Sequence, residues 1–280
     1  MTCSALPDDI PDTVERALLE DIGSGDLTAS LVPDTAARAE LVTHEDAVLC
    51  GTAWADEVFR QLNTLVRVTW LRRDGERIVA GSVVAYFEGP ARALLTGERC
   101  ALNFLQTLSG TATQAKRYAE ALRGTHCKVL DTRKTIPGLR RAQKYAVSCG
   151  GGHNHRLGLY DAVLIKENHI TAAGSVTAAL AKARAAVATG ISIEIEVENL
   201  NQLREALNAG ATRVLLDNFD LKGLAAAVRE TAGQATLEAS GGITLDNIRA
   251  IAETGVDYVS VGSLTKHVRA IDLSLRFQPR

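Results

Sequence analysis

The segment "CGGGHNHRLGLYDAVLIKENH" (149–169) gathers glycines, histidines and cations around one short apolar run. Residues 131–169 hold seven basic and three acidic side chains, although the whole chain has a formal net charge of −2. Glycine lets a backbone approach a ligand closely, and a cluster of cations attracts anions. The segment therefore predicts a receptacle for a small molecule with several negative charges.

A second group of chemically capable residues is the run of glutamates in "ISIEIEVEN" (191–199). In a strand, Glu194, Glu196 and Glu198 would all point to the same side. If that side faces the interior of the protein, the carboxylates need cations or a metal as partners. The candidate partners are Arg133, Lys134 and Lys166.

Small residues follow two later apolar runs, in "SGGIT" (240–244) and "VGS" (261–263). Backbone N–H groups in such loops bind phosphate oxygens, and the start of a following helix adds favourable partial charge. Thr244 is the expected N-cap of that helix and Gly255 its C-terminal glycine. These loops predict a phosphorylated ligand.

The pair His153 and His155 has a spacing that is also found in zinc sites, which need a third ligand. The cations of Lys134, Arg156 and Lys166 lie close by in the sequence or in neighbouring predicted loops, and they disfavour a divalent metal. Anion binding is the better interpretation of this loop.

The elements that must position these residues alternate regularly from residue 127 onward. Helical stretches are expected at 175–189, 199–210, 221–232 and 244–255. Strands are expected at 128–132, 162–168, 191–199, 213–219, 235–242 and 258–263. Apolar strands separated by helices predict a parallel sheet that is covered by helices, and six such units favour a β/α barrel, closed or slightly open. A doubly wound open sheet is the alternative. In a barrel, the polar residues listed above would share the rim formed by the carboxyl ends of the strands.

The first 110 residues have a different pattern, with a helix at 11–21 and β-rich runs at 39–51, 66–73 and 82–89. A long helical stretch then leads into the alternating region. We therefore expect an α/β protein with an N-terminal α+β domain (1–110) and a β/α barrel domain (111–280). Residues 268–280 are expected to pack back on the N-terminal domain.

Composition excludes several classes of protein. The balance of 31 basic and 33 acidic residues argues against a nucleic-acid or membrane-surface protein, and no apolar run is long enough to span a bilayer. The acids and prolines of "MTCSALPDDIPDTV" are unlike a signal peptide. An odd count of five cysteines without a CxxC pair favours reduced thiols in a cytoplasmic protein.

The block "DTRKTIPGLRRAQKYAVSCGGGHNHRLGLYDAVLIKENHI" (131–170) resembles the signature of the quinolinate phosphoribosyltransferase family. The similarity continues through "EIEVEN", "LLDNF", "SGGI" and "VDYVSVGSLTKH", and it includes "EDIGSGDLT" and "LLTGERCALNFLQTLSG" near the N-terminus. It thus covers nearly the whole chain. Ile136 departs from the threonine expected in the family, which affects the shape of the pocket wall but removes no charge.

This resemblance implies a glycosyltransferase that transfers phosphoribosyl from phosphoribosyl pyrophosphate to quinolinate. Decarboxylation follows, giving nicotinate mononucleotide, pyrophosphate and carbon dioxide in de novo NAD biosynthesis. It implies a homodimer, or a hexamer, with active sites shared between subunits. Magnesium is the implied cofactor, held by Glu196 and Asp217 directly or through water or substrate.

The resemblance also assigns roles to individual residues. Lys134, Glu196 and Asp217 are the implied catalytic residues. The implied quinolinate site consists of Arg99, Thr132, Arg133, Lys134, His155, Arg156 and Lys166. The implied phosphoribosyl pyrophosphate site consists of Lys134, Glu196, Asp217, Ser240, Gly241, Gly242, Val261, Gly262 and Ser263.

Three other functions share part of this pattern. A pyrophosphorylase that acts on another base would keep the phosphate loops but lose part of the carboxylate clamp, whose residues are all present here. An isomerase of sugar phosphates would share "SGGI" but would not need the other cations. A phosphometabolite-binding barrel would bind both substrates without turnover.

Overall fold

The computed structural model describes residues 3–278, which form two compact units with interleaved segments. Unit 1 comprises residues up to Lys116, Thr135–Gly151 and the chain from Leu264 onward, and unit 2 comprises Arg117–Lys134 and Gly152–Ser263. The domain boundary that the sequence suggested near residue 110 remains a prediction. Among the described residues, no helix is both long and apolar enough to cross a membrane.

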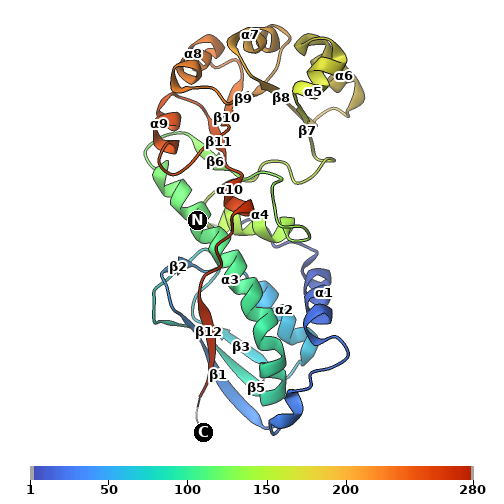
Figure 1. Cartoon of the computed structure of the whole chain (residues 1–280), viewed down its shortest axis with the longest axis vertical. Helices are drawn as coiled ribbons and strands as arrows, with labels where there is room; N and C mark the ends of the chain where they lie inside the picture. Colours follow the sequence, from blue (N-terminus) through green and yellow to red (C-terminus); the bar gives the residue numbers. More distant parts are fainter. Residues whose placement is uncertain (1–2, 279–280) are drawn as a thin grey trace. The chain divides into compact units, whose positions relative to one another are not determined.

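Unit 1 is an α+β unit built on a four-stranded antiparallel sheet of order β12-β1-β5-β3 (Figure 1), and β2 and β4 form a separate two-stranded sheet. Its strands are β1 (Ala36–Thr43), β2 (Ala47–Val48), β3 (Arg67–Trp70), β4 (Arg77–Ile78), β5 (Val83–Pro90) and β12 (Leu273–Phe277). Its helices are α1 (Ile10–Ile22), α2 (Thr52–Leu62), most of α3 (Ala91–Ala121) and α4 (Arg140–Cys149), together with the short 3₁₀ helix η1 (Ala29–Leu31). The core of this unit includes the fully buried Trp54, Phe59 and Phe87.

Strand β12 runs antiparallel to β1, with Leu275 opposite Leu41. The segment after residue 264 therefore completes the sheet of unit 1. On its other side β1 pairs with β5, so β1 lies inside the sheet.

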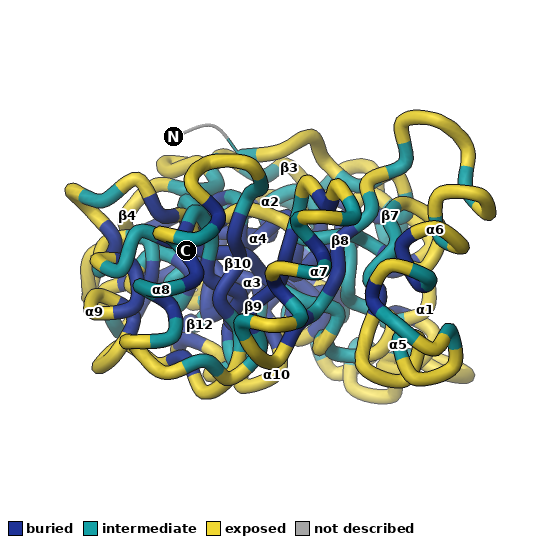
Figure 2. Tube along the Cα trace, turned by 90° about the horizontal axis from the view of Figure 1, so that it is seen from above, coloured by how far each residue is buried: buried dark blue, intermediate teal, exposed yellow. Residues whose placement is uncertain are grey.

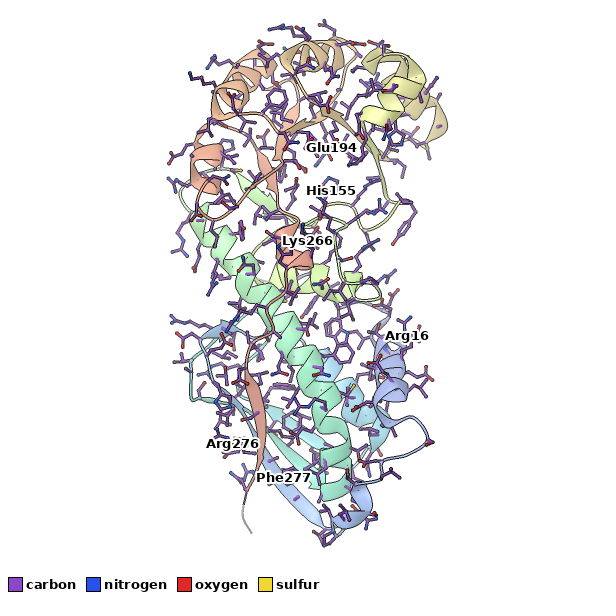
Figure 3. The ribbon with its side chains drawn as sticks, in the orientation of Figure 1. Arg16, His155, Glu194, Lys266, Arg276 and Phe277 are labelled. Atoms are coloured by element: carbon purple, nitrogen blue, oxygen red, sulfur yellow. A yellow bond between two sulfur atoms is a disulfide. The ribbon has the colours of Figure 1, made fainter. Side chains whose placement is uncertain are left out.

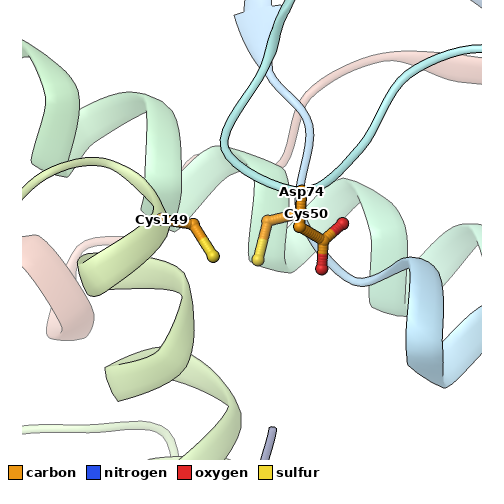
Figure 4. Close-up of side chains that lie close together, drawn as sticks. All are labelled: Cys50, Asp74 and Cys149. Carbon is orange, nitrogen blue, oxygen red and sulfur yellow. The ribbon is translucent and has the colours of Figure 1, made fainter. Parts of the chain in front are cut away.

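Unit 1 also contains a disulfide between Cys3 and Cys149, where the sequence led us to expect reduced thiols. Cysteine count and spacing gave no sign of this pair, because the two residues are 146 positions apart and meet only in the folded chain. The buried thiol of Cys50 and the carboxylate of Asp74 lie beside Cys149 (Figure 4). Asp74 accepts hydrogen bonds from the backbone N–H groups of Gly51 and Thr52 at the start of α2, so it caps that helix.

Unit 2 is a single parallel sheet of order β6-β11-β10-β9-β8-β7. The strands are β6 (Lys128–Leu130), β7 (Ala162–Ile165), β8 (Ser192–Val197), β9 (Arg213–Asp217), β10 (Thr236–Ser240) and β11 (Tyr258–Ser260). The helices are α5 (Glu167–Ala173), α6 (Val176–Ala186), α7 (Leu200–Asn208), α8 (Leu221–Thr231) and α9 (Ile248–Glu253), and α10 (Ser263–Lys266) begins at the boundary. Helices α5 to α9 lie along the outer side of the curved sheet (Figure 1), and their outer turns are exposed while β8 is largely buried (Figure 2).

The barrel of unit 2 is open, which confirms the six-stranded β/α architecture expected from the sequence. The strands at the two edges of the sheet are β6 and β7, the first two of the unit along the chain, and they do not pair with each other. The chain between them instead makes an isolated parallel bridge from His153 to Leu130 on the free edge of β6. The glycine- and cation-rich segment is therefore attached to the sheet at its open side.

Two local predictions were wrong. The helix expected from Thr244 begins at Ile248, and the position before it, Asn247, makes no side-chain cap. Glu198 was expected to share a strand face with Glu194 and Glu196, but β8 ends at Val197 and Glu198 is exposed. Alternation of residue types does not locate the point where a strand turns into a loop.

Candidate active site

A cavity of about 270 Å³ lies at the carboxyl ends of the strands of unit 2. All six strands or the residues directly after them contribute to its wall. The lining residues are Thr132, Arg133, Lys134, His155, Arg156, Leu164, Lys166, Glu196, Leu215, Glu238, Ser240 and Ser260. Convergence of every strand end on one cavity is the arrangement in which β/α barrels place their chemistry.

The loop that carries His155 and Arg156 is held by the buried carboxylate of Asp131, which directly follows β6. One oxygen of Asp131 accepts the backbone N–H of His155 (2.9 Å), and the other accepts the side-chain amide of Asn154 (2.6 Å). The N–H of Asp131 in turn donates to the carbonyl of His153. A glycine-rich segment is thus fixed in place by one buried acid.

Two guanidinium groups face the cavity from this loop and from the end of β6. Arg156 donates to the carbonyl of Ala162 at the start of β7 (3.2 Å). Burial lowers the pKa of Arg156, and the like charge of Arg133 lowers it further. A pair of partly buried guanidiniums that repel each other is a binding site for an anion.

Lys166 and Glu196 form an ion pair across the ends of β7 and β8, with 3.5 Å between Nζ and Oε2. Lys166 precedes α5, and its backbone N–H donates to Nδ1 of His169 in the first turn of that helix. Burial raises the pKa of Glu196, Lys166 opposes this rise, and the negative charge of Asp217 adds to it. Glu196 and Asp217 are therefore close enough to repel each other, and two such oxygen ligands suit a hard divalent cation such as Mg²⁺.

Below these residues lies a buried group of charges that the sequence did not reveal as a unit. His155 contacts the carboxylates of Glu194 (2.9 Å) and Glu238 (3.6 Å). Arg213 lies 3.6 Å from Glu194 and 4.0 Å from Glu238. Figure 3 shows His155 and Glu194 together within unit 2.

Glu194 thus takes partners that were not among the three cations considered from the sequence, whereas Glu196 takes one of them. Glu238 is a missed residue. It is a charged side chain inside the apolar strand "TLEAS", two positions before Ser240 and so on the same face.

The two loops expected to bind phosphate follow β10 and β11. Gly241 and Gly242 both have positive φ (99° and 58°), and a Cβ on Gly241 would clash with the side-chain oxygen of Asn218. A Cβ on Gly262 would come within 2.9 Å of the Lys134 side chain. Glycine is therefore required where these loops pass close to their neighbours.

The structure brings together eight of the residues selected from the sequence as lining of one cavity: Thr132, Arg133, Lys134, His155, Arg156, Lys166, Glu196 and Ser240. The remaining residues selected in unit 2 are next to that cavity in sequence or in their loops but do not line it: Asp217, Gly241, Gly242, Val261, Gly262 and Ser263. Arg99 lies on α3 in unit 1, where its guanidinium is exposed and stands 4.0 Å from Glu98.

Comparison with known proteins gives consistent matches along the chain. Residues 26–109 match the model of the quinolinate phosphoribosyl transferase N-terminal domain, and residues 111–276 match that of the C-terminal domain. A probable nicotinate-nucleotide pyrophosphorylase [carboxylating] from Bacillus subtilis is 44% identical over 92% of this chain and 89% of its own length. A nicotinate-nucleotide pyrophosphorylase [carboxylating] from Mycobacterium leprae is 44% identical over 94% of this chain and 95% of its own.

Solved structures agree with these sequence matches. The nicotinate-nucleotide pyrophosphorylase from Francisella tularensis superposes with a TM-score of 0.95 at 47% identity, covering 98% of each chain. NadC from Streptococcus pyogenes gives a TM-score of 0.94 at 40% identity over 99% of this chain and 100% of its own.

Proposed function

Because the chain belongs to the quinolinate phosphoribosyltransferase family and is a nicotinate-nucleotide pyrophosphorylase (carboxylating) of NAD biosynthesis, we propose that the cavity of unit 2 is its active site. The observation that carries this proposal is the gathering of Arg133, Lys134, Arg156 and Lys166 in one cavity that is also lined by Glu196. Quinolinate is a pyridine dicarboxylate and phosphoribosyl pyrophosphate is a polyanion, so both substrates need cations.

In this proposal Arg133, Arg156 and Lys166 bind the two carboxylates of quinolinate. A guanidinium pairs with a carboxylate through two parallel hydrogen bonds, which fixes the plane of the pyridine ring. His155 supports the clamp by positioning Arg156, whose backbone N–H its Nδ1 accepts (2.7 Å), and Thr132 positions the next residues by accepting the N–H of Lys134 (3.1 Å). Arg99 completes the clamp from a second subunit.

Phosphoribosyl pyrophosphate is proposed to lie across Lys134 and the two glycine loops. The loops that bind its phosphate are Ser240, Gly241 and Gly242 after β10 and Val261, Gly262 and Ser263 after β11. Glu196 and Asp217 face the ribose, and they also have the charge and donor atoms to hold Mg²⁺. When bound, Mg²⁺ would neutralise negative charge on the departing pyrophosphate.

The reaction then needs fixed charges and no covalent nucleophile. The pyridine nitrogen bonds to the anomeric carbon while the bond from that carbon to pyrophosphate breaks, and positive charge develops on the ribose. Lys134 stabilises the departing anion, and the carboxylates of Glu196 and Asp217 stabilise the developing cation. The bond from the adjacent ring carbon to carbon dioxide then breaks, and its electron pair stays on that carbon, where the positively charged ring nitrogen stabilises it until the carbon takes up a proton.

The proposed assignment is tested by forming nicotinate mononucleotide from quinolinate and phosphoribosyl pyrophosphate, with and without Mg²⁺. Lys134→Ala should abolish product formation, and the exposed Lys182→Ala on α6 is the matched control. Full activity of the Lys134 variant would contradict the assignment of the cavity. Retention of full rate after metal removal would contradict the role of Mg²⁺.

The assembly and the compartment are proposals as well. A homodimer, or a hexamer, is proposed in which Arg99 of one subunit completes the clamp of another. A cytoplasmic location is proposed from the composition; relatives include proteins named as chloroplastic and mitochondrial.

A further inference from the structure

The floor of the cavity contains more negative than positive charge if all its acids are ionised. Two carboxylates, Glu194 on β8 and Glu238 on β10, are 4% and 1% exposed. Their oxygens and Nε2 of His155 all lie within 4.8 Å of one another. Arg213 on β9 is the permanently charged cation that contacts both.

The hydrogen bonds of His155 indicate that its imidazole is neutral. Nδ1 accepts the backbone N–H of Arg156, so it carries no proton of its own. Nε2 therefore holds the ring proton and donates it to Glu194 at 2.9 Å. Among the described residues, Arg213 is then the permanent cation that lies within 4.0 Å of both carboxylates.

Glu238 is the carboxylate with the weaker partners in this arrangement, since His155 lies 3.6 Å and Arg213 4.0 Å from it. Neither of its oxygens makes a hydrogen bond to the part of the chain that the structure describes, and Arg213 is farther from it than from Glu194. Burial and the charge of Glu194 raise the pKa of Glu238 to about 7, and the charge of Arg213 opposes this rise. The groups around it come from β8 (Glu194), β9 (Arg213), β11 (Ser260) and the loop after Gly152 (His155).

We propose that Glu238 is a specificity-determining residue of the dicarboxylate site: it stands in the cavity wall as the neutral acid, and its ionised form excludes the substrate. This inference rests on the proposed function of the cavity. With Glu238 neutral, Arg213 balances Glu194, and the cations of the clamp remain available to quinolinate. With Glu238 ionised, a buried negative charge faces a doubly negative ligand at low dielectric, where repulsion is strong.

We expect the affinity for quinolinate to depend on pH through the ionisation of Glu238. Calorimetric titrations between about pH 6 and 8.5 should show wild-type affinity falling up to about tenfold per pH unit once Glu238 ionises. Quinolinate keeps the same charge over this range. Glu238→Gln, a neutral isostere, should bind quinolinate with nearly constant affinity, and Glu253→Gln on the surface of α9 should behave like the wild type.

A second measurement does not depend on the variant folding. Titrations of the wild type at about pH 8 in two buffers of different ionisation enthalpy should show uptake of up to about one proton on binding quinolinate. Glu238→Gln should show no such uptake.

Two outcomes would overturn the inference: wild type and Glu238→Gln lose affinity in parallel as the pH rises, or the wild type binds quinolinate at about pH 8 without taking up a proton. The proposed function fails in a different way, since quinolinate would then not bind the wild type at any pH, and this result would overturn both.

Discussion

At the scale of single residues, Arg133 and Arg156 repel each other in the absence of an anion. Replacing either by alanine removes a charge-assisted pair with a substrate carboxylate from a partly buried position, which should weaken quinolinate binding by about 2–5 kcal/mol. Calorimetric titration measures the loss directly. Thermal unfolding should change little, because relief of the repulsion offsets lost packing.

Arg204→Ala is the matched control for these variants. Arg204 is also an arginine of unit 2, but it forms an exposed ion pair with Glu230 on the outer surface. Its removal should leave quinolinate affinity unchanged. Equal affinity in the wild type and in both cavity variants would show that the clamp lies elsewhere.

Glu196 and Asp217 belong to the other substrate in the proposed site. Glu196→Gln and Asp217→Asn keep the size of each side chain but remove the charge that stabilises the developing ribose cation. Turnover with phosphoribosyl pyrophosphate should fall by about a hundredfold or more, while quinolinate affinity changes by less than about tenfold. Steady-state kinetics and calorimetry on the same preparations separate the two effects, and an equal loss in both would assign these residues to the wrong substrate.

The residues of the site were predictable to different degrees. Arg133, Lys134, Arg156 and Lys166 are polar groups at strand ends, and the sequence shows them because each follows an apolar run. The contacts of Glu194 could not be predicted, since His155 lies in a loop attached to the open edge of β6, and the sequence does not give the register that brings Arg213 on β9 close to β8. Glu238 was hidden for a physical reason: it is a single acid inside an apolar strand, and its significance comes from its neighbours on β8 and β9.

At the scale of elements, all six parallel strands fall where the sequence predicted them. Each strand is an apolar run that is followed by glycines or polar residues, so the alternation of strands with helices is clear in the sequence. The sequence located the ends of these strands less accurately than the strands themselves. The strand expected over 162–168 stops at Ile165, because Lys166 and Glu167 begin a helix whose first turn is closed by His169.

The loop after β10 gives a prediction about backbone conformation. Gly241 has φ +99° and little space for a side chain, so Gly241→Ala should distort the loop that is proposed to hold phosphate. The KM for phosphoribosyl pyrophosphate should rise by about tenfold or more, consistent with a strain of about 1–3 kcal/mol placed on the site.

Gly174→Ala serves as the control for that variant. Gly174 ends α5 with nearly the same φ, +96°, but open space surrounds it. Gly174→Ala should therefore lower the stability of the protein through backbone strain, without changing the KM for phosphoribosyl pyrophosphate. If both variants changed the KM equally, the effect would come from general destabilisation and not from the phosphate loop.

At the scale of the whole molecule, we propose that the clamp joins the cavity residues of unit 2 to Arg99 of unit 1 from a second subunit. In a dimer with shared sites, two inactive variants should complement each other. Mixing Arg99→Ala with Lys134→Ala after reversible dissociation gives random pairs, and each mixed dimer has one site with both defects and one with neither. Activity should return to about a quarter of the wild type.

Each parent alone, taken through the same dissociation, provides the baseline for that experiment. If every subunit built its own site, each site in the mixture would retain one defect. A mixture as inactive as its parents, with dimers confirmed by light scattering, would contradict shared sites.

The pairing of β1 with β12 has a consequence for the way this protein is made. His44, just after β1, and Ser274 on β12 form a hydrogen bond although they are 230 residues apart. During translation β1 and β5 leave the ribosome early, and the outer edge of β1 stays open while all the strands of unit 2 are synthesised. An open edge can pair with another chain, so the nascent protein is exposed to aggregation during this interval. Unit 2, whose strands are consecutive in the chain, can fold during the same interval, and unit 1 closes after it.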